Sequence, residues 1–216
     1  MTDIVETSGD LSPNPWFSIW LQPRATIQHI VDTDPRRLVL VLAASGGIVE
    51  ALNRASSKSL GDSLGLPAIF SIGIVVGAIS GILSLFVFGA LIRWTGRWLG
   101  GTASYEQIRA AIAWSLVPYL WTSLTWIPEL LLFGEEMFTT EMPRLEANPT
   151  LAFVFLGLII VELIGGVWAL VVYLKCLGQV QGFSAWKALG NVFLATLVFV
   201  VPIVLVVAVS ISASEV

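Results

Sequence analysis

The sequence predicts an all-α polytopic integral membrane protein, in which a short interfacial amphipathic helix precedes five transmembrane helices. Hydrophobic residues make up 56% of the 216-residue chain and charged residues 12%, against about 25% charged residues in soluble domains. The mean hydropathy is +0.86. Apolar stretches of the length that a helix needs to cross hydrocarbon recur along the chain. They lack strict alternation, so helices are favoured over a β-barrel.

The five apolar stretches differ in how strongly they predict a membrane span. They cover residues 37–55, 66–92, 108–133, 151–174 and 186–212. The first is the weakest, and losing it would leave four helices with both termini cytoplasmic. The second contains no charged residue. The others contain notable polar residues or prolines: Glu50 and Asn53 in the first, Pro118 and Pro128 in the third, Glu162 in the fourth, and Asn191 and Pro202 in the fifth.

The segment before the first span divides into two parts. Residues 1–13 read as a flexible acidic tail without a cleavable signal peptide. Residues 14–35 read as an interfacial cytoplasmic segment, because Pro23 suits the first turn of a helix whose Ile27, Ile30 and Val31 share one face. A short helix packed on the cytoplasmic ends of the bundle is the alternative, and the two are compatible. The membrane domain then covers residues 36–212, and residues 213–216 form a C-terminal tail.

Basic residues predict the orientation of the spans. Eight of the 11 Lys and Arg residues fall on the N-terminal side of the predicted membrane and three on the other side. Short loops rich in Lys and Arg stay in the cytoplasm. We therefore expect a cytoplasmic N-terminus, a C-terminus outside, and an acidic outer loop over residues 134–149.

Composition and motifs exclude several functional classes. A net charge of −4 without a basic block argues against nucleic-acid binding. The single cysteine, Cys176, excludes a disulfide scaffold, and one cysteine with one histidine, His29, gives no metal-site spacing. Phosphate loops, nucleophile elbows and hydrolase-type carboxylate pairs do not occur. We expect no catalytic residues, no cofactor, no metal and no enzymatic activity.

The connection into the third span contains the most informative motif. Ser104 and Gln107 form a capping-box sequence, Gly100 and Gly101 suit the tight turn before it, and Pro118 predicts a kink near mid-membrane. This Gly-Gly…Ser…Trp-Ser-x-x-Pro order resembles the Yip1 domain family. The Asn-Pro-Trp at residues 14–16 and the Gly-Phe-Ser at residues 182–184 are similar to its prokaryotic branch.

The resemblance implies a role in membranes rather than a chemistry. Eukaryotic Yip1-type proteins are Golgi and endoplasmic-reticulum membrane proteins that associate with prenylated Rab GTPases and with one another. Small-GTPase binding is implied here by analogy only, since no match to the tyrosine-and-glycine motif of that branch is present. The prokaryotic pattern implies a plasma or inner membrane.

Glu162 is the sharpest candidate for function, because it lies near the middle of the fourth span. An ionisable residue there costs at least about 2.5–3.5 kcal/mol and should face the bundle interior or water. No Lys or Arg lies at matching depth, so we expect hydrogen-bonding partners from Asn191, Tyr119, Thr122 and Ser123. Glu162 is then either a proton or cation site or a neutral side chain that joins helices.

Two further patterns leave alternatives open. Glu50 is placed to pair with Arg54 at i, i+4, and an acidic vestibule shared with Glu129 is the less favoured reading. Gly73, Gly77 and Gly81 form overlapping Gly-x-x-x-Gly units, which join helices either within one chain or between two. Gly165 and Gly166 are candidates to face this stripe.

The predicted function is a membrane scaffold or adaptor. It would self-associate or bind other membrane proteins, and its basic cytoplasmic rim of Arg93, Arg97 and Arg109 would favour partners or anionic lipid in the bilayer. The alternative is a small transporter or channel-like protein that uses Glu162 in a proton or cation path.

Overall fold

The computed structural model describes residues 14–214, and these are helical or in short connections without a strand. The predicted tail over residues 1–13 lies outside the described residues, as do residues 215 and 216. The helices are α1 (Pro15–Leu21), α2 (Pro23–Thr33), α3 (Val39–Ser57), α4 (Leu66–Trp98), α5 (Tyr105–Ser115), α6 (Val117–Thr122), α7 (Trp126–Phe133), α8 (Pro143–Ala147), α9 (Pro149–Gln181) and α10 (Ala185–Ser214), with 3-10 turns η1 (Leu60–Asp62), η2 (Ser123–Thr125) and η3 (Gly134–Phe138).

Five helical segments of the described chain are long and apolar enough to cross a membrane, as predicted. They are Val39–Ser57, Leu66–Trp98, Tyr105–Phe138, Pro149–Gln181 and Ala185–Ala208. The weak first span is present as a 19-residue helix, so the four-span alternative is not supported. The α4 and α9 helices have 33 residues each and are therefore about 50 Å long, more than the roughly 30 Å of hydrocarbon. Their C-terminal ends lie six and seven residues beyond those of the predicted spans, and α9 begins two residues earlier than predicted.

The third span is a series of short helices. Pro118 lies in the first turn of α6 and Pro128 near the start of α7, with the 3-10 turn η2 between these helices. Proline lacks the N–H that would continue the preceding helix, and its ring clashes with the carbonyl four residues earlier. The predicted kink is thus a succession of breaks, which exposes backbone and hydroxyl groups inside the bundle.

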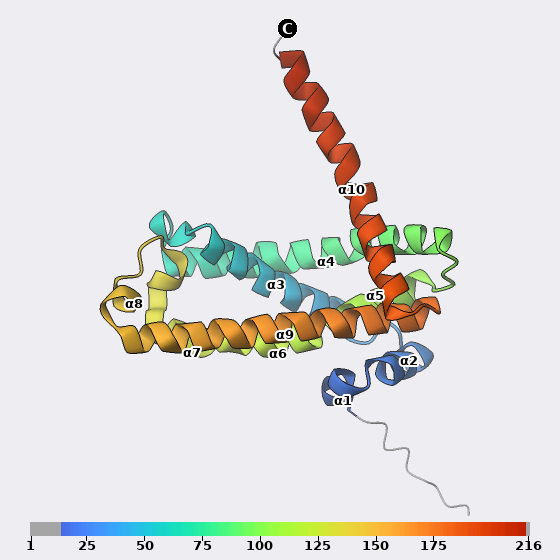
Figure 1. Cartoon of the computed structure of the whole chain (residues 1–216), viewed down its shortest axis with the longest axis horizontal. Coiled ribbons are helices and arrows are strands. Elements are labelled where there is room, and N and C mark those ends of the chain that lie inside the picture. The colour runs from blue at the N-terminus through green and yellow to red at the C-terminus, as the bar shows by residue number, and fades with distance from the viewer. Residues whose placement is uncertain (1–13, 215–216) are drawn as a thin grey trace, which may run out of the picture.

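The helices form a bundle with two distinct ends, from which α10 departs (Figure 1). We call the end with α2, the last turns of α4 and α9 and the starts of α5 and α10 the basic end. The end with η1, η3 and α8 is the acidic end. The helix of the fifth span, α10, packs at its start against α4 and α9, and its C-terminal half projects away from the bundle. It continues to Ser214, so residues 213 and 214 are helical rather than part of a tail.

The glycine stripe of α4 packs against α3 of the same chain. A Cβ atom on Gly47 of α3 would lie 2.1 Å from the Gly77 carbonyl oxygen, and one on Gly81 would lie 2.2 Å from the Ala43 carbonyl oxygen. Both distances are far inside van der Waals contact, so only glycine permits this approach. Of the two readings, the structure shows the contact within one chain. Gly165 instead faces Thr122 of α6, and Gly166 has open space beside it.

The N-terminal segment packs onto the basic end of the bundle. Its helix α2 spans the predicted residues, and Ile27, Ile30 and Val31 are buried against α5 and α9. Arg24 fixes this helix, since its Nη1 and Nη2 atoms each donate over 3.2 Å, to Gln179 Oε1 and to the Phe183 carbonyl. The helix α1, which the sequence did not indicate as helical, leaves Phe17 and Leu21 exposed. The segment is therefore docked on the bundle while keeping an apolar edge.

Candidate functional site

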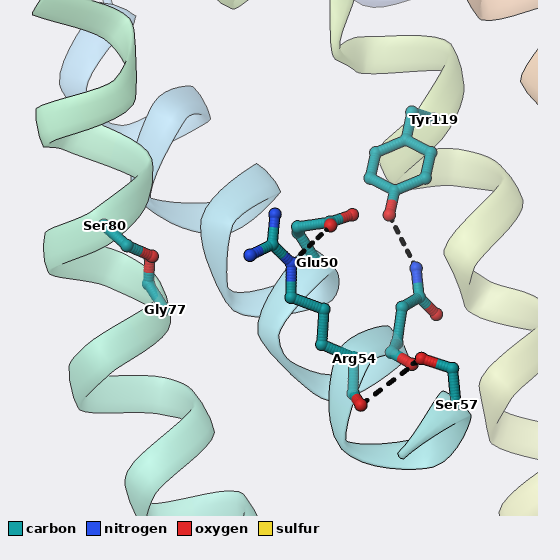
Figure 2. Close-up of polar contacts among 7 residues, drawn as sticks. Glu50, Arg54, Ser57, Gly77, Ser80 and Tyr119 are labelled. Carbon is teal, nitrogen blue, oxygen red and sulfur yellow. Dashed lines mark hydrogen bonds and ion pairs between the residues drawn. The ribbon is translucent and has the colours of Figure 1, made fainter. Parts of the chain in front are cut away.

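A large groove lies between α3, α4 and α6, beside the point where α10 leaves the bundle. Its volume is about 690 Å³ and its lining is mainly apolar. Glu50, Arg54, Ser80 and Tyr119 bring polar atoms to it (Figure 2). The predicted i, i+4 pair forms, with Arg54 Nε donating to Glu50 Oε1 over 2.7 Å. The pair partly satisfies two charges that would otherwise meet lipid.

One hydrogen bond leads from the groove to a second, smaller cavity. Asn53 Nδ2 donates to the Tyr119 hydroxyl oxygen over 2.7 Å. Tyr119 lines the groove, whereas Asn53 lines a cavity of about 130 Å³ on the other side. A polar connection thus joins the two spaces through the helix pair α3 and α6.

The smaller cavity contains two carboxyl groups from different spans. Glu162 of α9 and Glu129 of α7 both line it, together with Asn53 and Ser56 of α3. The Thr125 hydroxyl donates to Glu162 Oε1 over 2.6 Å. Glu129 is only 3% exposed, and none of residues 14–214 gives its carboxyl group a hydrogen bond or ion pair. The lining of this cavity therefore includes two acids and an amide but no cationic side chain.

The structure brings together only some of the residues predicted around Glu162. Thr122 and Ser123 use their hydroxyls on backbone carbonyls of their own turn, those of Pro118 and Leu120. Tyr119 reaches the cavity indirectly through Asn53. The hydroxyl that bonds to Glu162 is that of Thr125, about one turn beyond Thr122. The sequence did not predict this contact, because it gave no sign of the 3-10 turn η2 that contains Thr125.

Asn191 is the prediction that the structure contradicts most clearly. It is fully buried at the basic end, where its Oδ1 accepts from the Thr95 hydroxyl over 2.7 Å and its Nδ2 donates to the Ile92 carbonyl over 3.1 Å. Glu162 lies 19 residues before the end of α9 at Gln181, about 28 Å along the helix. Asn191 is only six residues into α10. Comparing the positions of Glu162 and Asn191 along their helices would have shown that the two residues lie at different depths in the membrane.

The acidic vestibule of Glu50 and Glu129 does not form either. Glu50 lines the large groove and Glu129 the small cavity, so the carboxyl group that accompanies Glu129 is that of Glu162. The antiparallel course of α7 and α9 brings these two acids to one depth. The chain positions alone gave no sign of this pairing.

The motif of the second connection builds a polar contact at the basic end. The capping box forms as predicted, with Gln107 N donating to Ser104 Oγ over 3.2 Å and Ser104 N donating to Gln107 Oε1 over 2.8 Å. Gly100 has φ +83°, a conformation that favours glycine. A Cβ atom on Gly101 would lie 2.1 Å from Gln181 Oε1. The two glycines therefore permit the turn and admit the Gln181 side chain of α9.

The predicted basic rim lies beside this motif. Arg93 and Arg97 of α4 line a cleft of about 270 Å³, and Arg109 of α5 lines a neighbouring one of the same size. The Arg109 guanidinium carbon is 4.5 Å from the centroid of the Tyr105 ring and 4.9 Å from that of Phe86. Among residues 14–214, none of the three arginines is paired with a carboxylate.

A family model, the Yip1 domain, matches residues 17–208. The chain belongs to the Yip1 family. The match runs from α1 into α10, so all five spans, the docked N-terminal segment and the Gly100–Pro118 motif belong to this Yip1 domain. No curated protein and no solved structure matches the chain.

The geometry of this Yip1 domain limits what chemistry its polar site can perform. Within the described residues no group of three or more His, Cys, Asp and Glu side chains gathers in one place. The small cavity offers two carboxyl groups, an amide and a hydroxyl, all of them hard oxygen ligands. Two neighbouring carboxyl groups in a poorly hydrated site favour sharing one proton or binding one cation. Nothing in this arrangement activates a nucleophile.

Proposed function

We propose that this Yip1-family protein is a self-associating membrane scaffold without catalytic activity, presenting its basic face to partners or lipids. The observation that carries the proposal is the departure of α10 from its own bundle beside an open groove (Figure 1). A span that leaves its own chain in this way is suited to pack on another. Binding of a small GTPase rests on family analogy alone.

The first third of α10 is held firmly. Ala188 and Asn191 are fully buried, Ala195 is almost so, and the ring centroid of Phe199 lies 5.5 Å from that of Phe88 in α4. Beyond Phe199, each side chain of residues 200–208 is exposed. The change from buried to exposed within one helix marks where α10 stops following the bundle.

The groove lies where a fifth span running antiparallel to α4 would pack. It extends from Ile69 near the acidic end to Ile92 and Val192 near the basic end, and α10 borders it only through its first turns. Apolar side chains of α4 such as Ile72 and Val76 remain exposed along it. We infer that α10 of a second copy fills this groove, and that the exchange is reciprocal around a two-fold axis.

Cross-linking between two differently tagged copies tests this exchange. Val200 lies nine residues beyond Asn191 in α10, and the groove residue Ser84 lies eight residues before Ile92 in α4, so both lie at one depth. Cys176 is buried and is the only cysteine, so the variants carry Cys176→Ala. Copies with Val200→Cys and Ser84→Cys, co-expressed in membranes, should form a mixed disulfide on mild oxidation.

The matched control uses the lipid-facing side of α9. Leu170 is exposed at a similar depth and does not line the groove, so Leu170→Cys paired with Val200→Cys should give only background cross-linking. Equal yields for the Ser84 and Leu170 pairs, or a monomer in mass photometry of the native protein, would refute self-association through α10.

A second function is favoured by the pairing of Glu129 with Glu162. Both acids line one cavity with Asn53, and Asn53 bonds to Tyr119, which lines the groove, so polar groups of α7, α9, α3 and α6 lie between the two spaces. Such a series suits a proton or cation path. It also suits a structural site, so the path needs a measurement of transport.

Flux into proteoliposomes separates these two roles. A path predicts proton or monovalent-cation flux above that of empty vesicles, reduced to background by Glu162→Gln and by Glu129→Gln. The control Glu146→Gln changes an exposed acid of the acidic end and should keep wild-type flux. Wild-type flux at the level of empty vesicles would remove the transporter function and leave the scaffold intact.

A further inference from the structure

The cleft between the last turns of α4 and Tyr105 has the composition of an anion site. It measures about 270 Å³, and its lining consists of Ala90, Arg93, Trp94, Arg97 and Tyr105. Two of these five side chains are cationic and none is acidic. In addition, α4 contains no acidic residue at all, and α5 contains only Glu106.

The one nearby acid is already engaged. Glu106 Oε1 accepts from both Nε and Nη2 of Arg36, over 3.1 and 2.5 Å. The ion pair holds the Glu106 carboxylate at the neighbouring cleft, which Arg36 and Arg109 also line, and not at the cleft of Arg93 and Arg97. Arg93 and Arg97 therefore line one cleft without a counter-charge from either helix that forms it.

The arrangement of Arg93 and Arg97 is energetically unfavourable, and a bound anion would stabilise it. Arg93 and Arg97 are one turn apart, and like charges at i, i+4 repel. The Nε atom of Arg93 is buried without a hydrogen-bond acceptor in the structure, as is that of Arg109. A buried donor without an acceptor is unfavourable. An oxyanion in the cleft would accept hydrogen bonds from Arg93 and neutralise both guanidinium groups.

The depth of the cleft indicates which anion reaches it. Trp94 and Trp98 stand exposed beside it with ring centroids 4.9 Å apart, at the end of an apolar helix where tryptophan marks the membrane interface. Leu83 and Phe86, both exposed, continue the same face of α4 toward the centre of the span. A phosphate at the arginines would thus have an acyl chain along α4.

We propose that Arg93 and Arg97, with Tyr105, bind the phosphate of an anionic glycerophospholipid. Guanidinium groups match phosphate oxygens in a forked geometry, and Tyr105 is held in place because its hydroxyl donates to the Phe86 carbonyl over 2.6 Å. Arg109, whose guanidinium lies over the Tyr105 ring, adds positive potential. This inference specifies the lipid-binding part of the proposed scaffold and is independent of self-association.

Native mass spectrometry of the detergent-solubilised full chain, titrated with phosphatidylglycerol, measures this site. Each arginine near an anionic headgroup contributes about fivefold in affinity, so Arg93→Gln/Arg97→Gln should weaken retention by about 25-fold. The matched control is Lys175→Gln/Lys187→Gln, which removes the same charge from the same end of the bundle without touching the cleft. It should keep wild-type retention. Thermal midpoints and helicity of all variants verify the fold.

Two further measurements distinguish a lipid phosphate from a free phosphate as the bound anion. Inorganic phosphate and glycerol phosphate, at the same total phosphate concentration, should not displace the lipid, and phosphatidylcholine should bind more weakly than phosphatidylglycerol. If the arginine double variant is unstable, the exposed Arg97→Gln alone should weaken retention about fivefold.

Three outcomes would overturn the proposal: equal losses in the arginine and lysine variants, unchanged retention in the arginine variants, or displacement by inorganic phosphate. The disulfide experiment on α10 reads out self-association separately, so failure of one proposal is distinguishable from failure of the other.

Discussion

Individual side chains show how the breaks in the third span serve the polar cavity. In the 3-10 turn η2 the Thr125 hydroxyl lies 2.6 Å from Glu162 Oε1 and 2.9 Å from the Thr122 carbonyl oxygen. The hydroxyls of Thr122 and Ser123 bond to backbone carbonyls of their own turn and not to Glu162. A regular helix would have placed Thr122 and Thr125 on neighbouring faces with similar access to α9. The irregular backbone therefore selects which hydroxyl satisfies the carboxyl group.

Removing the Thr125 hydroxyl should destabilise the protein while keeping its shape. Thr125→Val leaves Glu162 without its hydrogen bond, and we expect a loss of about 1–2 kcal/mol, measured as a lower free energy of unfolding in detergent. The control Thr196→Val removes a hydroxyl that bonds only to the Val192 carbonyl of its own helix, and should have little effect. Equal losses in both variants would contradict a special role for Thr125.

The acidic end contains a contact that depends on pH. The Thr140 hydroxyl and backbone N–H both donate to the Asp62 carboxylate, over 2.6 and 3.0 Å, and these bonds lower the pKa of Asp62 below its ordinary 3.8. A lowered folded-state pKa means that the contact stabilises the fold above the ordinary pKa and is lost as pH falls through the folded-state value.

Hydrogen exchange is expected to detect this loss. Protection of the Thr140 amide should be constant above pH 4 and disappear in more acidic solution, whereas Asp62→Asn should show weaker protection with no such pH dependence. Protection of the wild type that persists in solution acidic enough to protonate Asp62 in the folded state would rule out the contact.

Close backbone contacts at glycine residues, rather than ion pairs, set how the helices pack on one another. Gly47, Gly77 and Gly81 let α3 and α4 approach backbone to backbone, and Gly101 admits Gln181 from α9. Hydrocarbon offers no hydrophobic drive between helices, so close packing and buried hydrogen bonds hold the bundle together. The stripe is used inside one chain, so the self-association that we propose would use another surface.

Substituting the stripe should reduce stability without changing self-association. Gly77→Ala would place a Cβ atom 2.7 Å from Ile48 Cα, and we expect a loss of about 1–3 kcal/mol from the forced separation of the helices. Gly166→Ala is the matched control, because no atom lies within 4 Å of its Cβ position. A thermal midpoint gives the first readout, and the Val200–Ser84 cross-link the second. A stable Gly77→Ala protein that loses the cross-link would place the stripe between chains.

The whole molecule has one end rich in basic residues and another that is acidic. The docked N-terminal segment, the capped connection into α5 and the basic rim all gather at one end, whereas Glu135, Glu136 and Asp62 lie at the other. With five spans, the excess of Lys and Arg predicts that the first end faces the cytoplasm. The lipid phosphates expected at Arg93 and Arg97 then belong to the cytoplasmic leaflet.

Reporter fusions test this arrangement directly. A phosphatase fused after Val216 should be active outside the cytoplasm and a fluorescent reporter at the same position dark, while a fluorescent reporter at the N-terminus should be bright. Fusion after Gly101 serves as an internal cytoplasmic control. A bright C-terminal reporter would exclude the five-span topology and restore the four-span alternative.

Sequence alone determined the properties that depend on length, composition and short range. Apolar runs gave five spans and the all-α class, local motifs gave the capping box at Ser104 and the Glu50–Arg54 pair, and charge asymmetry gave an expected orientation. Only the tertiary structure decided that Glu162 meets Thr125 and Glu129, that Asn191 belongs to the basic end, and that α10 departs from the bundle. These outcomes depend on the rotation and relative depth of helices distant in sequence, which hydropathy within each segment does not encode.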